Sequence, residues 1–485
     1  MLKNNAVLYT ADLPTYGLLI DGRWVEGAGP RVAVQDKYRL TPAAQLTTAD
    51  AAQVRLAVDA AHAAFRAGAP VAHERGVILE RAAQLLEEAS PQFVRAMQIE
   101  AGFTQSDAQG EVRRCIQTLK LSAEEARRIA GEVIPLAGAP GAAGRMGFTV
   151  RVPLGVVAAI TPFNSPLNTV THKVGPAFAA GNAVILKPSS FTPMTACLLA
   201  EILLQAGMPN GFLTLLPGSG EVVRALQADP RVRFFAFTGS TEVGRQIQQA
   251  AGLRRTQMEL GSIACTILCS DANLKTALPK IVNAGYRKAG QVCTSVQLLL
   301  VHRSLLSEVE QTMGQMVQNL SYGDPQDPHT FVGPVISEDN AIRIDAWIEE
   351  AVAKGARRLV GGKRQGAVVP PTLLTNLSDD MRVSCEEIFG PVVCIMPFDD
   401  LDQAIDRVNA TPYGLATGLF TNGLSEALAT AQKLDVGGVH INETSSSRVD
   451  LMPYGGTKDS GFGREGPRYA VHEMTEEKII TITVG

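Results

Sequence analysis

The apolar residues near the start of the chain recur at helical spacing. Between residues 48 and 131 they fall repeatedly on one face of a 3.6-residue period, and Ser90-Pro91 has the form of a helix start. The pattern predicts a layer of helices, ending near Gly131, with one apolar face to cover. Residues on that face include Val54, Ala57, Val58, Ala61, Phe65, Val112, Cys115, Ile116, Leu119 and Ala126.

A series of short, continuous apolar runs then predicts buried strands. The runs at 155–160, 183–186, 213–216 and 234–237 alternate with segments of helical spacing such as 194–206. Continuous apolar runs are typical of parallel strands that helices cover on both faces. A second alternation of strands and helices begins after residue 260. The sequence therefore predicts two α/β units in series, the first a doubly wound sheet.

Two segments fit neither unit. Residues 132–152 are rich in Gly, Ala and Pro, and the tail at 478–484 (KIITITV) is β-prone with no later segment to pair with. An uncovered strand edge invites pairing with another chain. We expect a projecting arm from the first segment and an intersubunit strand from the second.

Composition narrows the possible partners. The 485 residues are 46% hydrophobic and 19% charged, which is enough apolar surface for large buried cores. A net charge of −4 without a long basic run argues against a nucleic-acid or membrane partner and favours a small ligand. Seven cysteines without CxxC spacing favour neither a disulfide framework nor a metal site. Because the sequence has no apolar leader and no membrane-spanning run, we expect a cytoplasmic protein.

Three side chains are candidates for covalent chemistry. Cys293 follows a small, flexible approach in AGQVC that a carbonyl could use, although a buried structural role is usual for cysteine. Glu259, in the apolar motif MELG between the two units, would gain a raised pKa from burial and could act as a general base. Asn164 follows the first run, and its amide could donate to an oxyanion or shape a turn.

Two further features are candidates for phosphate binding. The glycine turn from Thr238 to Gly244 follows the fourth run and opens a helix, where free N–H groups could hold a pyrophosphate. The turn lacks the GxGxxG form, so a simple connection is the alternative. Lys187 ends the second run at the sheet edge where α/β proteins bind ligands, although it could also be a solvated strand end.

Seven motifs occur in order along the chain: TPFN, AVILKPS, FTGSTEVG, MELG, AGQVC, EEIFGPV and PYGGTKDSGFGREG. Together, from about Tyr16 to the end, they resemble the aldehyde dehydrogenase superfamily. The resemblance implies an α/β fold with a Rossmann-type cofactor domain, an α/β catalytic domain and a small β oligomerisation arm. The implied domains are 1–131 with 153–259 for the dinucleotide, 260–468 for catalysis, and 132–152 with 469–485 for the arm.

The resemblance also implies a role for each reacting group. Cys293 looks like the thiol nucleophile, Asn164 like the donor to the oxyanion of the thiohemiacetal, and Glu259 like the base that activates water for thioester hydrolysis. Hydride passes to NAD or NADP, and no metal takes part. The implied cofactor residues are Thr161, Pro162, Phe163, Lys187, Ser189, Ser190, Gly218, Phe237, Thr238, Gly239, Ser240, Gly244, Leu260, Glu387 and Phe389.

Departures from the family pattern bear on specificity. Ser190 stands where NAD-preferring members often carry a glutamate, so repulsion toward a 2′-phosphate is absent and NADP becomes possible. The C-terminal motifs look most like the branch of lactaldehyde, phosphonoacetaldehyde and non-phosphorylating glyceraldehyde-phosphate dehydrogenases. In that branch phosphate users tend to carry arginine where this chain has Val292, which argues against a phosphorylated substrate.

Several residues are candidates for substrate contact. Arg114, His172 and Arg448 could pair a carboxylate or sulfonate, or could instead serve as a surface ion pair, a packing residue and an interface residue. The small side chains of Ser165 and Thr169 leave room for an aromatic ring. The full set of candidates is Arg114, Ser165, Asn168, His172, Val292, Thr294 and Arg448.

We therefore expect a homodimer or homotetramer that oxidises a small polar, anionic or aromatic aldehyde to a carboxylic acid. A coenzyme A-acylating semialdehyde dehydrogenase is the alternative among enzymes, but acylating members lack the glutamate found here as Glu259. A catalytically silent structural member of the fold is the alternative outside enzymes. Cys293, Glu259 and Asn164 together argue against it, because packing alone does not require all three.

Overall fold

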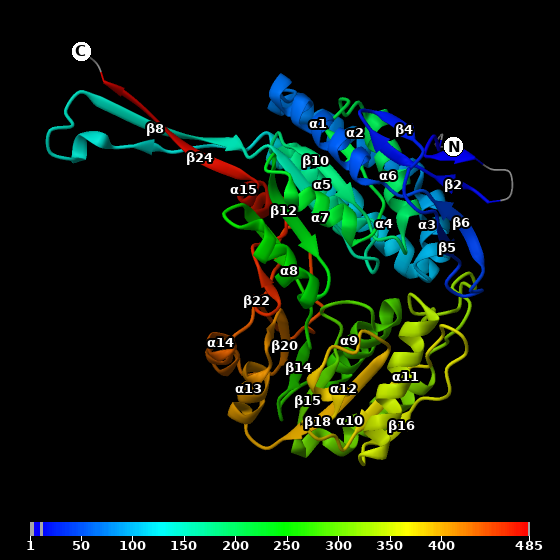
Figure 1. Cartoon of the computed structure of the whole chain (residues 1–485). Coiled ribbons are helices and arrows are strands. Elements are labelled where there is room, and N and C mark those ends of the chain that lie inside the picture. Colours follow the sequence, from blue (N-terminus) through cyan, green and yellow to red (C-terminus); the bar gives the residue numbers. More distant parts are fainter. Residues whose placement is uncertain (1–3, 10–12, 484–485) are drawn as a thin grey trace.

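The computed structural model describes residues 4–9 and 13–483, which form two lobes and a projecting arm (Figure 1). The expected cofactor domain and arm also include residues 1–3, 10–12 and 484–485, which lie outside the described residues. The α/β fold predicted from the sequence is confirmed. Each lobe is built around its own sheet and hydrophobic core, and the two cores divide between Leu260 and Ile263.

The predicted helical layer covers the sheet of the first lobe. α1 begins after Asp50, whose carboxylate accepts a hydrogen bond from Gln53 N at 2.8 Å, while the Gln53 side chain accepts from Asp50 N at 3.3 Å. The predicted apolar face of α1 is buried. The fourth helix ends before Gly131, where the sequence pattern placed its end. The helices of this layer are α1 (Ala51–Ala67), α2 (Ala72–Glu88), α3 (Ser90–Glu100) and α4 (Gln105–Ala126).

The first lobe contains an eight-stranded sheet in the order β23-β13-β12-β9-β10-β11-β3-β4. Its five central strands are parallel and four of them match the predicted apolar runs: β9 (Val156–Ile160), β10 (Ala183–Lys187), β11 (Leu213–Leu215) and β12 (Val232–Thr238), followed by β13 (Arg255–Glu259). The chain reverses direction across the sheet between β9 and β12. Open α/β sheets bind ligands outside the carboxyl ends of the strands at such a point.

Antiparallel strands and crossover helices complete this lobe. The short strands were not predicted, because two or three residues carry too little periodicity to be recognised. The antiparallel strands are β3 (Leu18–Ile20), β4 (Arg23–Val25) and β23 (Gly461–Phe462), and the helices are α5 (Asn168–Ala179), α6 (Pro193–Ala206), α7 (Gly220–Ala228), α8 (Thr241–Ala251) and α15 (Pro467–Glu473).

The second lobe has a seven-stranded sheet in the order β16-β17-β18-β15-β14-β20-β21, in which only β16 is antiparallel to its neighbour. Its strands are β14 (Cys265–Leu268), β15 (Leu298–His302), β16 (Arg357–Val360), β17 (Thr372–Thr375), β18 (Val392–Phe398), β20 (Ala416–Phe420) and β21 (Gly438–Ile441). Its helices are α9 (Leu274–Tyr286), η2 (Arg287–Gly290), η3 (Arg303–Leu305), α10 (Leu306–Gln318), α11 (Glu338–Ala353), α12 (Arg382–Cys385), α13 (Leu401–Ala410) and α14 (Leu424–Lys433).

The C-terminal tail finds its partner far upstream in the same chain. β24 (Thr475–Thr483) runs antiparallel to β8 (Arg145–Pro153), and β7 (Val133–Ile134) pairs with the other edge of β8. The two segments that fitted neither α/β unit therefore form one sheet that projects from the body (Figure 1). Pairing with another subunit stays a prediction. Apolar side chains exposed on this sheet are Val133, Met146, Ile479, Ile480 and Ile482.

Small elements remain. β1 (Val7–Tyr9), β2 (Thr15–Tyr16), β5 (Val32–Gln35) and β6 (Pro42–Leu46) form a four-stranded sheet, β19 (Tyr413–Gly414) pairs with β22 (Thr457–Lys458), and η1 (Leu136–Gly138) lies in the arm. Among residues 4–9 and 13–483, no helix combines the length and the apolarity that crossing a bilayer requires.

Candidate active site

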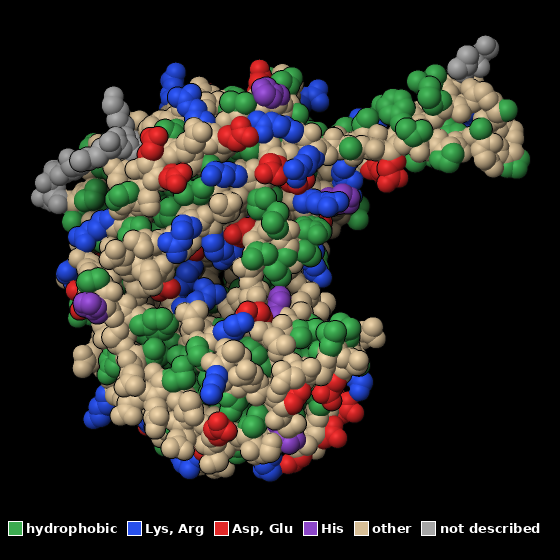
Figure 2. Space-filling model, turned by 180° about the vertical axis from the view of Figure 1, so that it is seen from behind, with side chains coloured by type: hydrophobic (Ala, Val, Ile, Leu, Met, Phe, Trp, Pro, Cys, Tyr) green, Lys and Arg blue, Asp and Glu red, His purple; other side chains and the backbone are tan. Residues whose placement is uncertain are grey.

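A cavity of about 340 Å³ is lined by residues from both lobes. Cys293, Glu259 and Asn164 are all among its lining residues, so the three predicted reacting groups share one space. Arg114, Ser165, Thr169, Val292, Thr294 and Arg448 also line it. On the face drawn in Figure 2 the surface is hollowed between the lobes, and Lys and Arg side chains gather at the hollow.

A tight turn presents Cys293 to this cavity. Lys288 and Ala289 both have a φ of +52°, and Gly290 has a φ of +69°. A Cβ atom at Gly290 would collide with a neighbouring backbone carbonyl, so glycine is required there. Burial raises the pKa of the Cys293 thiol to about 11, and a hydrogen bond with the Tyr454 hydroxyl, 2.8 Å from the sulfur, opposes that rise.

Glu259 ends β13 and lies beside Thr238 of β12 in the sheet register. Its side chain is buried, and neither carboxylate oxygen has a hydrogen-bond partner among the described residues. Burial raises the pKa of Glu259 well above its ordinary value, and the charge of Glu465 raises it further. Glu259 is therefore a buried carboxyl group that lines the cavity without a competing hydrogen-bond partner among the described residues.

Glu465 is buried as well, but its environment is the opposite. Its two carboxylate oxygens accept hydrogen bonds from Lys173 Nζ and Arg448 Nη2, each at 2.9 Å. Although burial opposes ionisation, the charges of Lys173 and Arg448 hold the pKa of Glu465 far below its ordinary range. The pKa values of the two buried carboxyl groups are thus shifted in opposite directions.

Asn164 lies in the loop after β9 and is tied to the cysteine turn. Its Nδ2 atom donates to Gln291 O at 2.8 Å, and Lys288 Nζ donates to Asn164 O at 3.3 Å. Lys288 is itself buried and paired with Glu111 at 2.7 Å. One N–H of the Asn164 amide joins the two lobes, and no described residue engages the other, so that N–H can serve a ligand.

The predicted cofactor residues cluster at the point where the first sheet reverses direction. Ser240 caps α8 by accepting from Val243 N at 3.4 Å, directly after β12. The side chain of Leu260 occupies the space that a Cβ atom at Gly244 would need. Lys187 ends β10 without a carboxylate partner among the described residues, and burial lowers its pKa to about 8. A half-buried amine and a capped helix start fit the phosphate and ribose groups of a dinucleotide.

Residues of the second lobe face this region. Glu387 Oε1 accepts from Ser262 N at 3.0 Å, and burial raises the pKa of Glu387 to about 7. The rings of Phe163 and Phe389 meet edge to face with centroids 5.8 Å apart. The other predicted cofactor residues lie at or just after the carboxyl ends of β9 to β12; they are Thr161, Pro162, Ser189, Ser190, Gly218, Phe237, Thr238 and Gly239.

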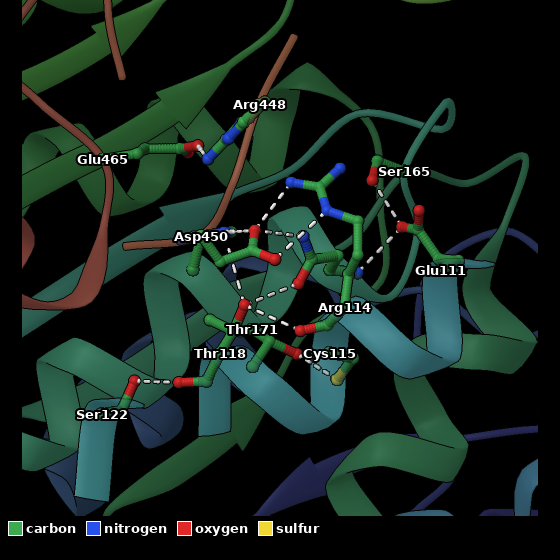
Figure 3. A network of polar contacts seen from close by, with 12 residues as sticks. Glu111, Arg114, Cys115, Thr118, Ser122, Ser165, Thr171, Arg448, Asp450 and Glu465 are labelled. Carbon is green, nitrogen blue, oxygen red and sulfur yellow. Dashed lines mark hydrogen bonds and ion pairs between the residues drawn. The ribbon is translucent and has the colours of Figure 1, made fainter. Parts of the chain in front are cut away.

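A polar network supports one wall of the cavity (Figure 3). Asp450 bonds to Arg114 Nη2 at 2.7 Å, His172 Nε2 at 2.8 Å and Asn168 Nδ2 at 3.1 Å. Although burial opposes it, the bonds from His172 and Arg114 hold the pKa of Asp450 well below its ordinary range. Arg114 reaches the cavity, whereas His172 and Asn168 are buried and are absent from its described lining. Both side chains hold Asp450 in place behind the wall.

The other substrate candidates are engaged in different ways. The Ser165 hydroxyl donates to Glu111, Arg448 pairs with Glu465, and the Thr294 hydroxyl lies 3.3 Å from that of Ser446. Val292 contributes an apolar surface next to the thiol.

Arg287 is a cavity cation that the sequence did not reveal. Among the described lining residues, Arg114, Lys288 and Arg448 each pair with a carboxylate. Arg287 forms no ion pair with any described residue, and its Nη2 atom donates to Ser446 Oγ at 2.7 Å. Burial lowers the pKa of Arg287, while the charges of Asp107 and Glu111 act to raise it. This guanidinium can receive the negative group of a ligand.

Other residues of the site were also missed. Tyr454 and Glu465 lie within PYGGTKDSGFGREG, so that motif pointed to them without giving them a role. Arg287 and Lys288 begin the turn that leads to Cys293, and their two adjacent cations were the available sequence signal. No sequence pattern around Asp450 pointed to a role in the site. Within the described ranges, no group of three or more His, Cys, Asp or Glu side chains could hold a metal ion.

Residues 24–480 match the model of the aldehyde dehydrogenase family. The chain belongs to this family. It is 45% identical over 470 residues to a 3-sulfolactaldehyde dehydrogenase of Priestia aryabhattai, an alignment that covers 97% of this chain and 98% of the relative. The expectation of an aldehyde dehydrogenase is therefore confirmed, and the 3-sulfolactaldehyde relative agrees with the predicted branch.

Solved structures of the aldehyde dehydrogenase family superpose on nearly the whole chain. Aldehyde dehydrogenase 21 from Physcomitrella patens, in complex with the reaction product succinate, has a TM-score of 0.94 at 37% identity and covers 97% of this chain and 98% of its own. The glyceraldehyde-3-phosphate dehydrogenase GapN of Methanocaldococcus jannaschii, complexed with NADP, has a TM-score of 0.90 at 35% identity, with coverages of 93% and 99%. The predicted aldehyde dehydrogenase fold is thus confirmed.

Proposed function

We propose that this aldehyde dehydrogenase oxidises a small, negatively charged aldehyde to the carboxylic acid, using NAD or NADP and water. The observation that carries the proposal is the shared cavity, in which the Cys293 thiol, the Asn164 amide and the partnerless Glu259 carboxyl group all lie. A nucleophile, an oxyanion donor and a base are the three groups that oxidation through a thioester requires.

Cys293 performs the covalent step. After its proton passes to water, the sulfur bonds to the aldehyde carbon and the carbonyl electron pair moves to oxygen, where the Asn164 side chain and the Cys293 N–H donate. When the oxyanion pair re-forms the carbonyl bond, the carbon loses hydride, for which a bound oxidised nicotinamide would be the acceptor, and Cys293 then carries a thioester. Glu259 then takes a proton from water, the water oxygen bonds to the thioester carbon, and the carbon–sulfur bond breaks.

Glu259 supports hydrolysis rather than transfer to coenzyme A. Its two oxygens have no competing partner among the described residues, so a water molecule can bond to them. The raised pKa of Glu259, caused by burial and by Glu465, means that its basic form grows as pH rises. Hydrolysis is expected to accelerate with pH for that reason.

Arg287 supports an anionic substrate. It lines the cavity and has no described carboxylate partner, and Ser446 beside it offers a second polar contact. The name of the 3-sulfolactaldehyde dehydrogenase and the succinate bound to aldehyde dehydrogenase 21 each point to an anionic group in a relative's ligand. Val292 offers no charge for a phosphate next to the thiol, so we favour a carboxylate or a sulfonate.

The domain roles follow the same proposal. Residues 1–131 and 153–259 would bind the dinucleotide together with β23 and α15, which the fold adds to the same lobe. The rest of 260–468 would carry the thiol, and 132–152 with β24 would join subunits of a dimer or tetramer. The exposed apolar side chains of the arm support the last role, because a partner would remove them from water.

The test is the initial rate of NAD(P)H formation with succinate semialdehyde, 3-sulfolactaldehyde, lactaldehyde, glyceraldehyde 3-phosphate and benzaldehyde, each with NAD and NADP. We expect the carboxylate and sulfonate aldehydes to give the highest kcat/KM without added coenzyme A. Cys293→Ala should remove all turnover. Preference for a neutral or aromatic aldehyde would contradict the substrate class, and a strict need for coenzyme A would contradict hydrolysis.

A further inference from the structure

The sulfur of Cys293 has one side-chain hydrogen-bond partner among the described residues, the hydroxyl of Tyr454, 2.8 Å away. Tyr454 comes from the loop between β21 and β22, far from Cys293 in the sequence, and is only 9% exposed. No step proposed above uses this hydroxyl, although it touches the reacting atom.

The tyrosine ring is held from two sides. Tyr454 N donates to Glu465 O at 3.1 Å, and Glu465 N donates to Tyr454 O at 2.7 Å. The guanidinium carbon of Arg448 lies 3.7 Å from the ring centroid, and Arg448 is in turn paired with Glu465. A cation over the ring face withdraws electron density from the phenol and makes its O–H a stronger donor. The hydroxyl is therefore both fixed in position and polarised.

The charged groups around Cys293 do not favour a thiolate on their own. Glu387 and Glu259 act against negative charge on the sulfur, and Arg448 acts for it. Arg287, on the turn before Cys293, is a further cation whose charge interacts with the sulfur. A buried sulfur anion needs hydrogen-bond donors in place of water, and such charge-assisted bonds are the strong ones.

We propose that Tyr454 is a further catalytic residue, which donates its hydroxyl hydrogen bond to the Cys293 sulfur whenever that sulfur carries negative charge. The inference rests on the proposed function, since it assigns a role within the same reaction. The Tyr454 hydroxyl acts twice in each cycle. It donates when the thiolate forms before attack, and again when the carbon–sulfur bond breaks and the electron pair returns to sulfur. The proton stays on Tyr454 throughout.

The test is the pH dependence of Cys293 alkylation by iodoacetamide, read by mass spectrometry of the Cys293 peptide in wild type and Tyr454→Phe. The substitution keeps the ring and its contact with Arg448 and removes only the hydroxyl. We expect the apparent pKa of Cys293 to rise by about one to two units, so alkylation below that pKa slows by about ten- to 100-fold. Both the first turnover and the steady-state rate should fall as well.

Tyr286→Phe is the matched control. Tyr286 is fully buried, and its hydroxyl donates to Thr372 O at 2.9 Å rather than to Cys293. It should leave the Cys293 profile unchanged, and the exposed Cys385 serves as an internal reference in every sample. Coincident Cys293 profiles in wild type and Tyr454→Phe, or equal shifts in Tyr454→Phe and Tyr286→Phe, would overturn the assignment.

The alkylation assay needs neither aldehyde nor cofactor. If no aldehyde supports NAD(P)H formation, the proposed function fails while the Cys293 profile still reports the Tyr454 bond. If aldehyde oxidation is normal but the profile of Tyr454→Phe does not move, only the role of Tyr454 fails.

Discussion

Two buried carboxyl groups at the cavity lie in opposite environments, which shift their pKa values in opposite directions. Glu259 has no hydrogen-bond partner among the described residues, and its pKa is raised by burial and by the neighbouring charge of Glu465. Glu465 is paired with Lys173 and Arg448 and stays ionised. The same residue type therefore serves as a reactive group in one place and as a fixed charge in the other.

The carboxylate of Asp450, in the cavity wall, is hydrogen-bonded and charge-paired like that of Glu465, unlike the carboxyl group of Glu259. Asp450 takes hydrogen bonds from Arg114, His172 and Asn168, and its charge is fully compensated. Asp450 and Glu465, which hold the shape of the site, are paired with cations, whereas the Glu259 carboxyl group has no hydrogen-bond partner among the described residues. Arg287 follows the same rule among the cations. Substituting an unpaired group should therefore change activity, and substituting a paired group should change stability.

Glu259→Gln should have the largest effect on catalysis. Without a base for water, steady-state turnover should fall by about 10²- to 10⁴-fold, while the first turnover still yields about one equivalent of reduced cofactor. Rapid-mixing measurement of NAD(P)H separates the burst from the steady state. A normal steady-state rate would mean that another group activates water.

The pH profile of the steady state is a control for the same prediction. Because the pKa of Glu259 is raised, its basic form, and with it wild-type turnover, should increase as pH rises. Glu259→Gln should lose this rise. If the variant keeps the wild-type slope, the titrating group is not Glu259.

Arg287→Gln tests the open cation. Removing the guanidinium should raise KM for a carboxylate or sulfonate aldehyde by about ten- to 100-fold, because a charge-assisted contact is lost, and should leave KM for lactaldehyde within about twofold. Arg114→Gln is the comparison, since Arg114 is already paired with Asp450. Equal effects of both substitutions on the anionic substrate would contradict the distinction between open and satisfied cations.

Asp450→Asn tests a satisfied group. The change keeps the size of the side chain but removes the charge that pairs with Arg114. We expect a loss of about 2 kcal/mol in the free energy of unfolding, below the usual cost of breaking a buried pair, because the Arg114 side chain is 32% exposed. Urea unfolding measures this free energy. Asp379→Asn is the control, because Asp379 forms its ion pair with Arg407 at the surface.

The stability effect of Asp450 should depend on pH. Its pKa is lowered in the folded state, so its contribution is fully present above the pKa of an unfolded aspartate, near 4, and is lost as pH falls toward the folded value. The gap between wild type and Asp450→Asn should therefore be constant near neutrality and shrink below about pH 4. A gap that widens in acid would mean that the variant acts through another group.

The sequence predicted the parts of the fold that have local periodicity. β9 and β10 are continuous apolar runs because both faces of the sheet are covered, and α1 shows its buried stripe directly. The pairing of β24 with β8 was not predicted, because their register depends on a partner far away in the sequence.

The candidate site divides in the same way. Cys293, Glu259 and Asn164 follow recognisable motifs, and the fold brings them into one cavity. His172 and Asn168 were expected beside the substrate, but the structure places them on Asp450, which no local pattern connects to either residue. Contacts made by loops that meet only in the folded state, such as Tyr454 with Cys293, leave no periodic trace in the sequence.

Ser190→Glu should have the smallest effect, because it alters a recognition contact at the rim of the site. The Ser190 hydroxyl donates to Gly218 O at 3.3 Å. Ser190 follows Lys187 by three residues, and the Lys187 amine has no carboxylate partner in the described part of the chain. A glutamate here would repel a 2′-phosphate and pair with Lys187, so the ratio of kcat/KM for NADP to that for NAD should fall by about tenfold. Ser190→Gln matches the size without the charge. If both variants change the ratio equally, bulk rather than charge decides it, and Lys187 is not an open cation in the sense that Arg287 is.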